Sequence, residues 1–278
     1  MSAAPARQSL RVACVQMNTA GDTAANLAAA RRLVREAAAA GARLIVLPET
    51  WAYKGRRTGI LAAAEPVDGP CNAALRDLAV ELGVFVHNGS HYEPSPRRDR
   101  VFNTSALFGP DGALLATYRK VHLFDAVSGG TVYRESDDLL PGDEVVTADV
   151  DGVTVGLSIC YDLRFPELYR ALALRSAEVL LVPSAFTHHT GAAHWEVLLR
   201  ARAVENGCFV VAPDQTGVHL PGRQCYGNSM VVDPWGTVLA RLGEEVGVCL
   251  ADLDLEAVAT VRAQIPSLAG RRPEVYGL

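Results

Sequence analysis

The chain has 278 residues, 49% of them hydrophobic and 21% charged, and its formal net charge is -5 at pH 7. This composition is typical of a folded globular protein, and the length suffices to bury a large core. The mildly acidic charge excludes a basic surface for nucleic acid or for anionic lipid, so we expect neither as a partner. No apolar run reaches the length of a membrane-spanning helix.

The N-terminus and the cysteines indicate the compartment. Residues 1–9 contain no long apolar core, so we expect a short disordered lead-in rather than a secretory signal. The chain has six cysteines, several of them within apolar strand-like runs, and no C-x-x-C pair. Reduced thiols in the cytoplasm are therefore the better interpretation, and a zinc site or a redox dithiol is disfavoured.

Strand-like and helical patterns alternate along the first half of the chain. One helix is expected between Gly21–Thr23, which offers capping side chains, and Gly41, and a second helix over Cys71–Leu82. The sequence GPDG at 109–112 predicts a hairpin turn. Residues 124–141 show no regular pattern, and we expect irregular chain there. Strands are predicted at Leu10–Met17, Arg43–Leu47, Val84–Val86, Val101–Phe108 and Leu114–Val121.

The second half continues the alternation. Helices are predicted from Pro166 to about Arg175, around Trp195–Arg202, and near Leu255–Gln264. Two strands are expected within residues 145–160, and further strands at Val179–Val182, Cys208–Ala212, Met230–Val232, Val238–Ala240 and Val248–Leu253. This order predicts an α/β protein with helices packed on sheets. No linker rich in Gly, Pro or Ser divides the chain, so we expect one domain over residues 10–278.

Three of the apolar runs end in a residue suited to acyl transfer, namely Glu49, Lys120 and Cys160. Sites of open α/β folds assemble at strand ends. There, a thiol attacks a carbonyl, a carboxylate takes the thiol proton and later activates water, and an ammonium stabilises the oxyanion. The backbone N–H of Tyr161 is a candidate second oxyanion donor. Each residue also has a plain alternative: packing for the cysteine, a cap or ion pair for the glutamate, and a solvated strand end for the lysine.

These stretches resemble the signature blocks of the nitrilase superfamily of carbon–nitrogen hydrolases. The blocks are "LIVLPET", "YRKVHLF" and "ICYDLRFPE". The similarity extends through "NTSALFGPDGALLATYRK", "PSAFTHHTGAAHWEVLLRARAVEN", "YGNSMVVDPWGTVLA" and "RRPEVYG". It covers almost the whole chain in order, which makes the resemblance specific.

The resemblance implies a four-layer α-β-β-α sandwich and a Glu-Lys-Cys triad made of Glu49, Lys120 and Cys160. It also implies an assisting carboxylate, matched by Glu135, whose alternative is a solvated loop acid. The family needs no cofactor and no metal. Its members form homodimers or higher homo-oligomers through the helix after the nucleophile strand, the "HWEVLLRAR" segment and C-terminal segments.

The residues after the nucleophile bear on the substrate. Nitrile-cleaving members carry tryptophan and glutamate there, whereas this chain has Tyr161 and Asp162. The chain is most similar to the omega-amidase and deaminated glutathione amidase group. We therefore expect a cysteine-dependent amidase that hydrolyses a small carboxylate-bearing amide through a thioester. The alternatives are an N-carbamoyl amine or amino-acid hydrolase, a nitrilase, an acyltransferase, and a binding protein without catalysis.

Arg164 is the candidate for substrate capture, because related carbamoylases grip a carboxylate with an arginine here. Its alternative is an ion pair with Asp162 or Glu167. The expected pocket walls are Tyr53, Phe186 and Thr187.

Two further features bear on the pocket. Asn228 stands where many relatives have histidine, and this difference affects the substrate if the position lies near the pocket. His188, His189 and His194 are interpreted as loop polar groups and a helix-start residue rather than as metal ligands.

Overall fold

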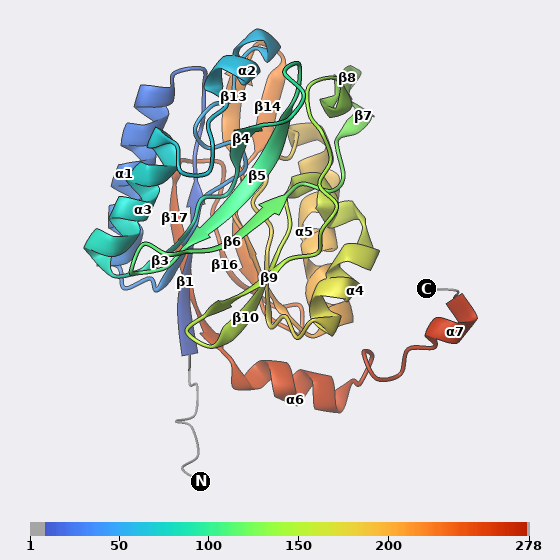
Figure 1. Ribbon diagram of the computed structural model, residues 1–278. Helices are drawn as coiled ribbons and strands as arrows, with labels where there is room; N and C mark the ends of the chain where they lie inside the picture. The colour runs from blue at the N-terminus through green and yellow to red at the C-terminus, as the bar shows by residue number, and fades with distance from the viewer. Residues whose placement is uncertain (1–8, 277–278) are drawn as a thin grey trace.

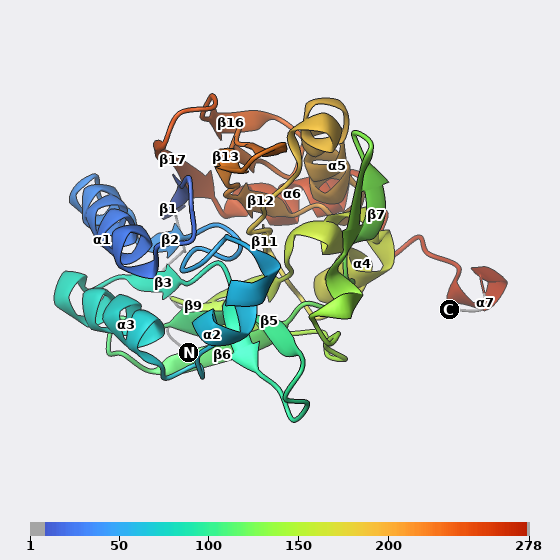
Figure 2. The same ribbon diagram turned by 90° about the horizontal axis from the view of Figure 1, so that it is seen from above.

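The computed structural model describes residues 9–276, and within them two β-sheets pack face to face with helices on their outer faces (Figures 1 and 2). The predicted four-layer α-β-β-α sandwich is confirmed. Most of the lead-in expected at 1–9 lies outside the described residues, but Ser9 already belongs to a strand. That residues 10–278 form one domain stays a prediction.

The first sheet has seven strands in the order β17-β1-β2-β3-β5-β4, with β6 also paired to β5. Its centre is parallel, because β1, β2 and β3 run in one direction, while the flanking pairs are antiparallel. The strands are β1 (Ser9–Gln16), β2 (Leu44–Val46), β3 (Phe85–His87), β4 (His91–Pro94), β5 (Val101–Phe108), β6 (Leu114–Arg119) and β17 (Gly247–Asp254).

The second sheet has six strands in the order β16-β15-β12-β11-β10-β9. Here β10, β11 and β12 form the parallel centre. The strands are β9 (Thr147–Val150), β10 (Val153–Leu157), β11 (Val179–Leu181), β12 (Phe209–Ala212), β15 (Met230–Val232) and β16 (Val238–Arg241). The carboxyl ends of both parallel centres are therefore available to build a site.

Helices cover the outer face of each sheet (Figure 2). On the first sheet lie α1 (Thr23–Ala39), whose first turn is capped by the Asp22 side chain, and α3 (Pro70–Leu82). On the second lie α4 (Pro166–Leu174) and α5 (His188–Asn206). After β17 the chain leaves the sheets through α6 (Glu256–Gln264) and α7 (Pro273–Tyr276), which lies away from the body (Figure 1).

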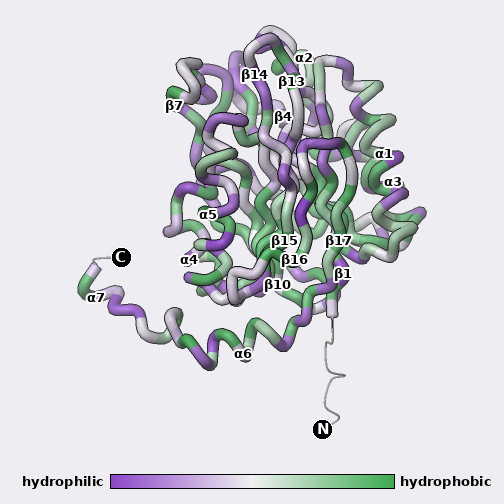
Figure 3. The backbone as a smooth tube through the Cα atoms, turned by 180° about the vertical axis from the view of Figure 1, so that it is seen from behind, coloured by the Kyte–Doolittle hydropathy of each residue, from purple (hydrophilic) through white to green (hydrophobic). Residues whose placement is uncertain are grey.

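Strand alternation divides the core into two clusters. In β1, Val12 and Cys14 face the second sheet, whereas Ala13 and Val15 face α1 and α3. A strand buried on both faces reads as a continuous apolar run, and the central strands are correspondingly hydrophobic in Figure 3. Among residues 9–276, no helix is both long and apolar enough to cross a membrane.

The main differences from the sequence prediction are short hairpins and one helix boundary. Residues 124–141, expected to be irregular, contain the hairpin β7 (Asp125–Ser128) and β8 (Thr131–Arg134). A second hairpin, β13 (Thr216–Leu220) and β14 (Arg223–Tyr226), was not predicted either. These strands mix exposed, half-buried and buried positions, so they lack the apolar run that marks a core strand. α5 begins at His188, so His188 and His189 are helical rather than in a loop.

Candidate active site

Glu49, Lys120 and Cys160 each directly follow a strand or lie within three residues of its end, and backbone hydrogen bonds fix all three. The Glu49 N–H donates to the carbonyl of Ser184, 3.3 Å away, which ties the end of β2 to the second sheet. The Cys160 N–H donates to the carbonyl of Pro183 at 2.9 Å, and that of Lys120 to Asn103 at 2.9 Å. The two sheets thus bring the three residues together.

The Lys120 ammonium lies between two carboxylates. Its Nζ is 2.8 Å from Glu49 Oε1 and 2.9 Å from Glu135 Oε2, and its side chain is 0% exposed. Asn103 Nδ2 donates to the same Glu49 oxygen at 2.8 Å, and the N–H of Phe124 donates to Glu135 at 2.8 Å. The carboxylate positions are therefore set by several donors, as a preorganised site requires.

The charges of the site favour an ionised base beside a neutral thiol. Burial acts to raise the pKa of Glu49, but the positive charges of Lys120 and Lys54 outweigh it, and the pKa is lowered overall. Burial acts to lower the pKa of Lys120, and the two carboxylates raise it well above the usual range. Burial, with the charge of Glu49, raises the pKa of the Cys160 thiol well above its usual range.

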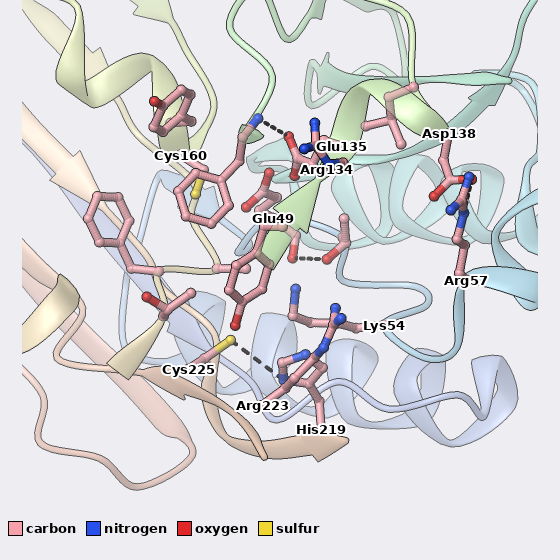
Figure 4. A pocket seen from close by; sticks show the side chains of 18 of the residues that line it. Glu49, Lys54, Arg57, Arg134, Glu135, Asp138, Cys160, His219, Arg223 and Cys225 are labelled. Carbon is pink, nitrogen blue, oxygen red and sulfur yellow. Dashed lines mark hydrogen bonds and ion pairs between the residues drawn. The ribbon is translucent and has the colours of Figure 1, made fainter. Parts of the chain in front are cut away.

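Cys160 has the backbone conformation of a strained turn. Its φ is 49°, in the left-handed region that non-glycine residues rarely adopt, and it opens the 3₁₀ turn η3 (Cys160–Arg164). Such a conformation costs about 1–3 kcal/mol and persists only where its surroundings enforce it. Here the turn aims the thiol into a cavity instead of the core (Figure 4).

Asp162 holds this turn in place. From the sequence it served only to distinguish this chain from nitrile-cleaving members of the family. Its Oδ2 accepts hydrogen bonds from the Tyr118 hydroxyl at 2.6 Å and from the Ile159 N–H at 2.8 Å. Its Oδ1 accepts from the N–H of His122 at 3.0 Å. The side chain is fully buried, so these bonds link the segment after β6 to the nucleophile turn.

A cavity of about 330 Å³ opens beside the triad (Figure 4). Of the residues singled out from the sequence, those lining it are Glu49, Glu135, Cys160, Tyr161, Arg164, Phe186 and Thr187. Tyr53 is not among the lining residues. Its hydroxyl donates to the Arg56 carbonyl at 3.0 Å, and its ring packs beside Gly55 and Gly59. The chain turns after Tyr53, and the next side chain enters the cavity instead.

Arg164 is placed by aromatic and histidine contacts rather than by the alternative ion pair. Its guanidinium lies 5.3 Å from the ring centroid of Phe186, and Nη1 is 3.3 Å from His194 Nδ1. Within the described residues it forms no ion pair with Asp162 or Glu167. The cation is thus available to the cavity.

Several cavity residues were missed from the sequence. They are Lys54, Tyr92, His219, Arg223 and Cys225. None of them ends a predicted core strand, and three belong to the hairpin β13–β14, which has no strong sequence signal.

Asn228 and His188 do not extend the site. Asn228, with φ 56°, does not line the cavity, and its Oδ1 accepts from Arg241 Nη2 at 2.7 Å. His188 lies 3.5 Å from a carboxylate oxygen of Glu244. No group of three or more His, Cys, Asp or Glu in residues 9–276 is arranged to hold a metal ion.

Comparison with known proteins identifies the family. The model of the carbon-nitrogen hydrolase family matches residues 11–263. The chain is 42% identical over 264 residues to a deaminated glutathione amidase of Synechocystis, covering 93% of this chain and 97% of that protein. It is 38% identical over 271 residues to human omega-amidase NIT2, covering 97% and 98% of the two chains.

The fold agrees with this match. The structure of Saccharomyces cerevisiae Nit3, a member of the nitrilase superfamily, superimposes with a TM-score of 0.84 at 33% identity, over 93% of this chain and 95% of that one. This chain therefore belongs to the carbon–nitrogen hydrolase family of the nitrilase superfamily, and it is a hydrolase of carbon–nitrogen bonds other than peptide bonds.

Proposed function

We propose that the protein is an amidase whose nucleophile is Cys160 and whose substrate is a small carboxylate-bearing amide, such as a keto-acid omega-amide or deaminated glutathione. The observation that carries this is the Lys120 ammonium held between Glu49 and Glu135, with Glu49 and the Cys160 thiol lining the same cavity. The names of the relatives support the substrate class, and so does the unpaired Arg164 in the cavity.

The first half-reaction forms a thioester. The Glu49 carboxylate accepts the proton of the Cys160 thiol, and the sulfur attacks the amide carbonyl carbon. The Lys120 ammonium and the N–H of Tyr161 donate to the developing oxyanion. The carbon–nitrogen bond then breaks, the nitrogen takes the proton from the glutamic acid, and ammonia or an amine leaves. The acyl group stays on the cysteine sulfur.

The second half-reaction hydrolyses the thioester. Glu49, again a carboxylate, takes a proton from water, whose oxygen attacks the thioester carbon. The carbon–sulfur bond breaks, the sulfur recovers the proton from the glutamic acid, and the carboxylic acid product leaves. In both halves Glu135 holds the Lys120 ammonium in position.

The test is a product-release screen with a cysteine control. Wild type, Cys160→Ala and Cys71→Ala are compared on a keto-acid omega-amide, deaminated glutathione, an N-carbamoyl amino acid and a nitrile. Cys71 lies in α3, within the core cluster that faces the helices. We expect ammonia or amine release from the first two substrates, a loss of roughly 10³-fold or more in Cys160→Ala, and wild-type rates in Cys71→Ala. Full activity of Cys160→Ala would refute the proposal, and carbon dioxide release would favour the carbamoyl alternative.

We further propose a cytoplasmic homodimer. All six cysteines are unpaired, which suits a reducing compartment. The outer face of α5 exposes Val197 and Val204 beside Trp235, with exposed fractions of 61%, 51% and 58%, and such an apolar face is typical of an interface. Light scattering on the purified protein gives the mass, and a monomer would contradict this assembly.

A further inference from the structure

The chain contains two lysines, and both stand beside the carboxylate of Glu49. Lys120 is fully engaged by Glu49 and Glu135. Lys54, five residues after Glu49, directs its side chain into the cavity (Figure 4) and makes no ion pair with any carboxylate of residues 9–276. The mechanism above assigns it no role. Its ammonium is held in no ion pair, although the charge of Glu49 acts on it, so it can still donate hydrogen bonds to an anion that enters the cavity.

The polar groups around Lys54 supply no negative charge at neutral pH. Burial raises the pKa of the Tyr92 hydroxyl, and it raises that of the Cys225 thiol to about 12. Burial, together with the charges of Lys54 and Arg223, lowers the pKa of His219 to about 3. All three groups are therefore uncharged at pH 7, and the carboxylate whose charge acts on Lys54 is Glu49, which also pairs with Lys120.

Arg223 adds a second cation to the same end of the cavity. It comes from β14, and Figure 4 shows it beside Lys54, His219 and Cys225, on the side of Glu49 away from Glu135. Its guanidinium lies 5.1 Å from the ring centroid of Tyr133, and it makes no ion pair with a described carboxylate. A guanidinium stacked on a ring still offers its N–H edge to an anion.

The remaining cavity cations differ in their partners and positions. Arg57 is paired with Asp137 and Asp138. Arg164, which is unpaired, belongs to the nucleophile turn and lies against Phe186 and His194, so it approaches the cavity from the second sheet. Arg134 also lines the cavity, makes no ion pair with a described carboxylate and lies beside Glu135, away from Lys54 and Arg223 (Figure 4). The unpaired cations thus come from several parts of the wall.

We propose that Lys54 and Arg223 form a second anion subsite, so that the preferred substrate is an amide with a carboxylate on each side of the scissile carbon–nitrogen bond. This rests on the proposed amidase function and narrows it. Arg164 binds one carboxylate and the Lys54–Arg223 pair binds the other. A primary omega-amide that releases ammonia has no group beyond the nitrogen, whereas deaminated glutathione carries a terminal glycine carboxylate there.

The test compares two substrates that differ in one charge: deaminated glutathione, and the same molecule with its glycine carboxylate converted to an N-methyl amide. The measured quantity is the ratio of kcat/KM for the acid to that for the amide. An effect of Lys54 on the ionisation of Glu49 is common to both substrates and cancels in this ratio. We expect the ratio to fall about 10- to 100-fold in Lys54→Met and in Arg223→Gln, which is the size of a lost charge-assisted hydrogen bond.

Two further variants serve as controls. Lys54→Arg keeps the charge and should retain most of the ratio. Arg56→Gln removes an exposed cation outside the cavity wall and should leave the ratio unchanged. Equal ratios in wild type, Lys54→Met and Arg223→Gln overturn the subsite.

Binding to the inactive Cys160→Ala protein separates the subsite from the amidase reaction. Calorimetry gives the affinities of the acid and of its N-methyl amide in this background, with and without Lys54→Met. If the wild type hydrolyses neither compound and no keto-acid omega-amide, the proposed function fails. A preference for the acid that depends on Lys54 then still supports the subsite, and the absence of that preference overturns it.

Discussion

Lys120→Met removes the cation that pairs with both Glu49 and Glu135, while keeping a side chain of similar length. In the native protein the Glu49 side chain is only 4% exposed, and that of Lys120 is 0% exposed. After the substitution Glu49 keeps the hydrogen bond from Asn103 but loses its nearest charge partner. The variant therefore tests whether the buried pair acts as one electrostatic unit.

The magnitude follows from this burial. Breaking a buried ion pair by removing one partner typically costs about 3–5 kcal/mol, because the other charge is left uncompensated. In a protein of this size that corresponds to a fall in Tm of about 10 °C. The oxyanion also loses a donor, so kcat should drop by roughly 100-fold or more.

The stability lost in Lys120→Met should increase as the pH rises. Without Lys120, Lys54 still lowers the pKa of Glu49, but we expect burial to outweigh it and to raise that pKa above its unfolded value of about 4.3. As pH rises above that value, the unfolded chain releases the proton while the folded chain keeps it, so stability falls until the folded pKa is passed. The stability difference from wild type should be smaller at pH 5 than at pH 8.

The assay is thermal and urea unfolding at pH 5 and pH 8. The double variant Glu49→Gln/Lys120→Met removes the stranded charge and should recover part of the stability at pH 8. Arg119→Met is the matched control, since Arg119 pairs with Glu93 at the surface with 47% of its side chain exposed, and it should cost no more than about 1 kcal/mol at either pH. An equal loss at both pH values, with no recovery in the double variant, would refute the reasoning.

Two predictions concern other buried acids. Asp162→Ala leaves the Tyr118 hydroxyl without its acceptor, so urea unfolding should show a stability loss of about 3 kcal/mol and kcat should fall. Glu167→Ala, at an exposed position of the next helix, is the control and should change neither the stability nor kcat. Asp214 is fully buried, and burial raises its pKa well above the usual range, although the N–H of Phe186 donates to it. Above about pH 4 the unfolded state releases a proton that the folded state keeps, so wild-type stability falls with pH through this group. The Tm of Asp214→Asn relative to wild type should therefore rise between pH 4.5 and pH 8, and a constant difference would contradict this.

The fold class, the family and the three residues at strand ends could be predicted from the sequence. Glu49 and Cys160 follow buried parallel strands, which are continuous apolar runs, and Lys120 follows an antiparallel strand that a hairpin turn marks. The resemblance in the blocks around them was specific enough to add Glu135, whose carboxylate contacts Lys120 in the structure.

The other side chains that share the cavity could not be predicted, because distant segments meet there in the folded chain. Tyr53 and Lys54 are adjacent in sequence, and a turn of the chain, which no pattern of apolar residues records, points the lysine inward and packs the tyrosine beside Gly55 and Gly59. Arg223 comes from an exposed hairpin far along the chain. The spacing of apolar residues predicts which face of a helix or strand is buried. A cavity, however, is assembled from loops and polar residues of distant segments. Its lining therefore depends on contacts that the local sequence does not specify.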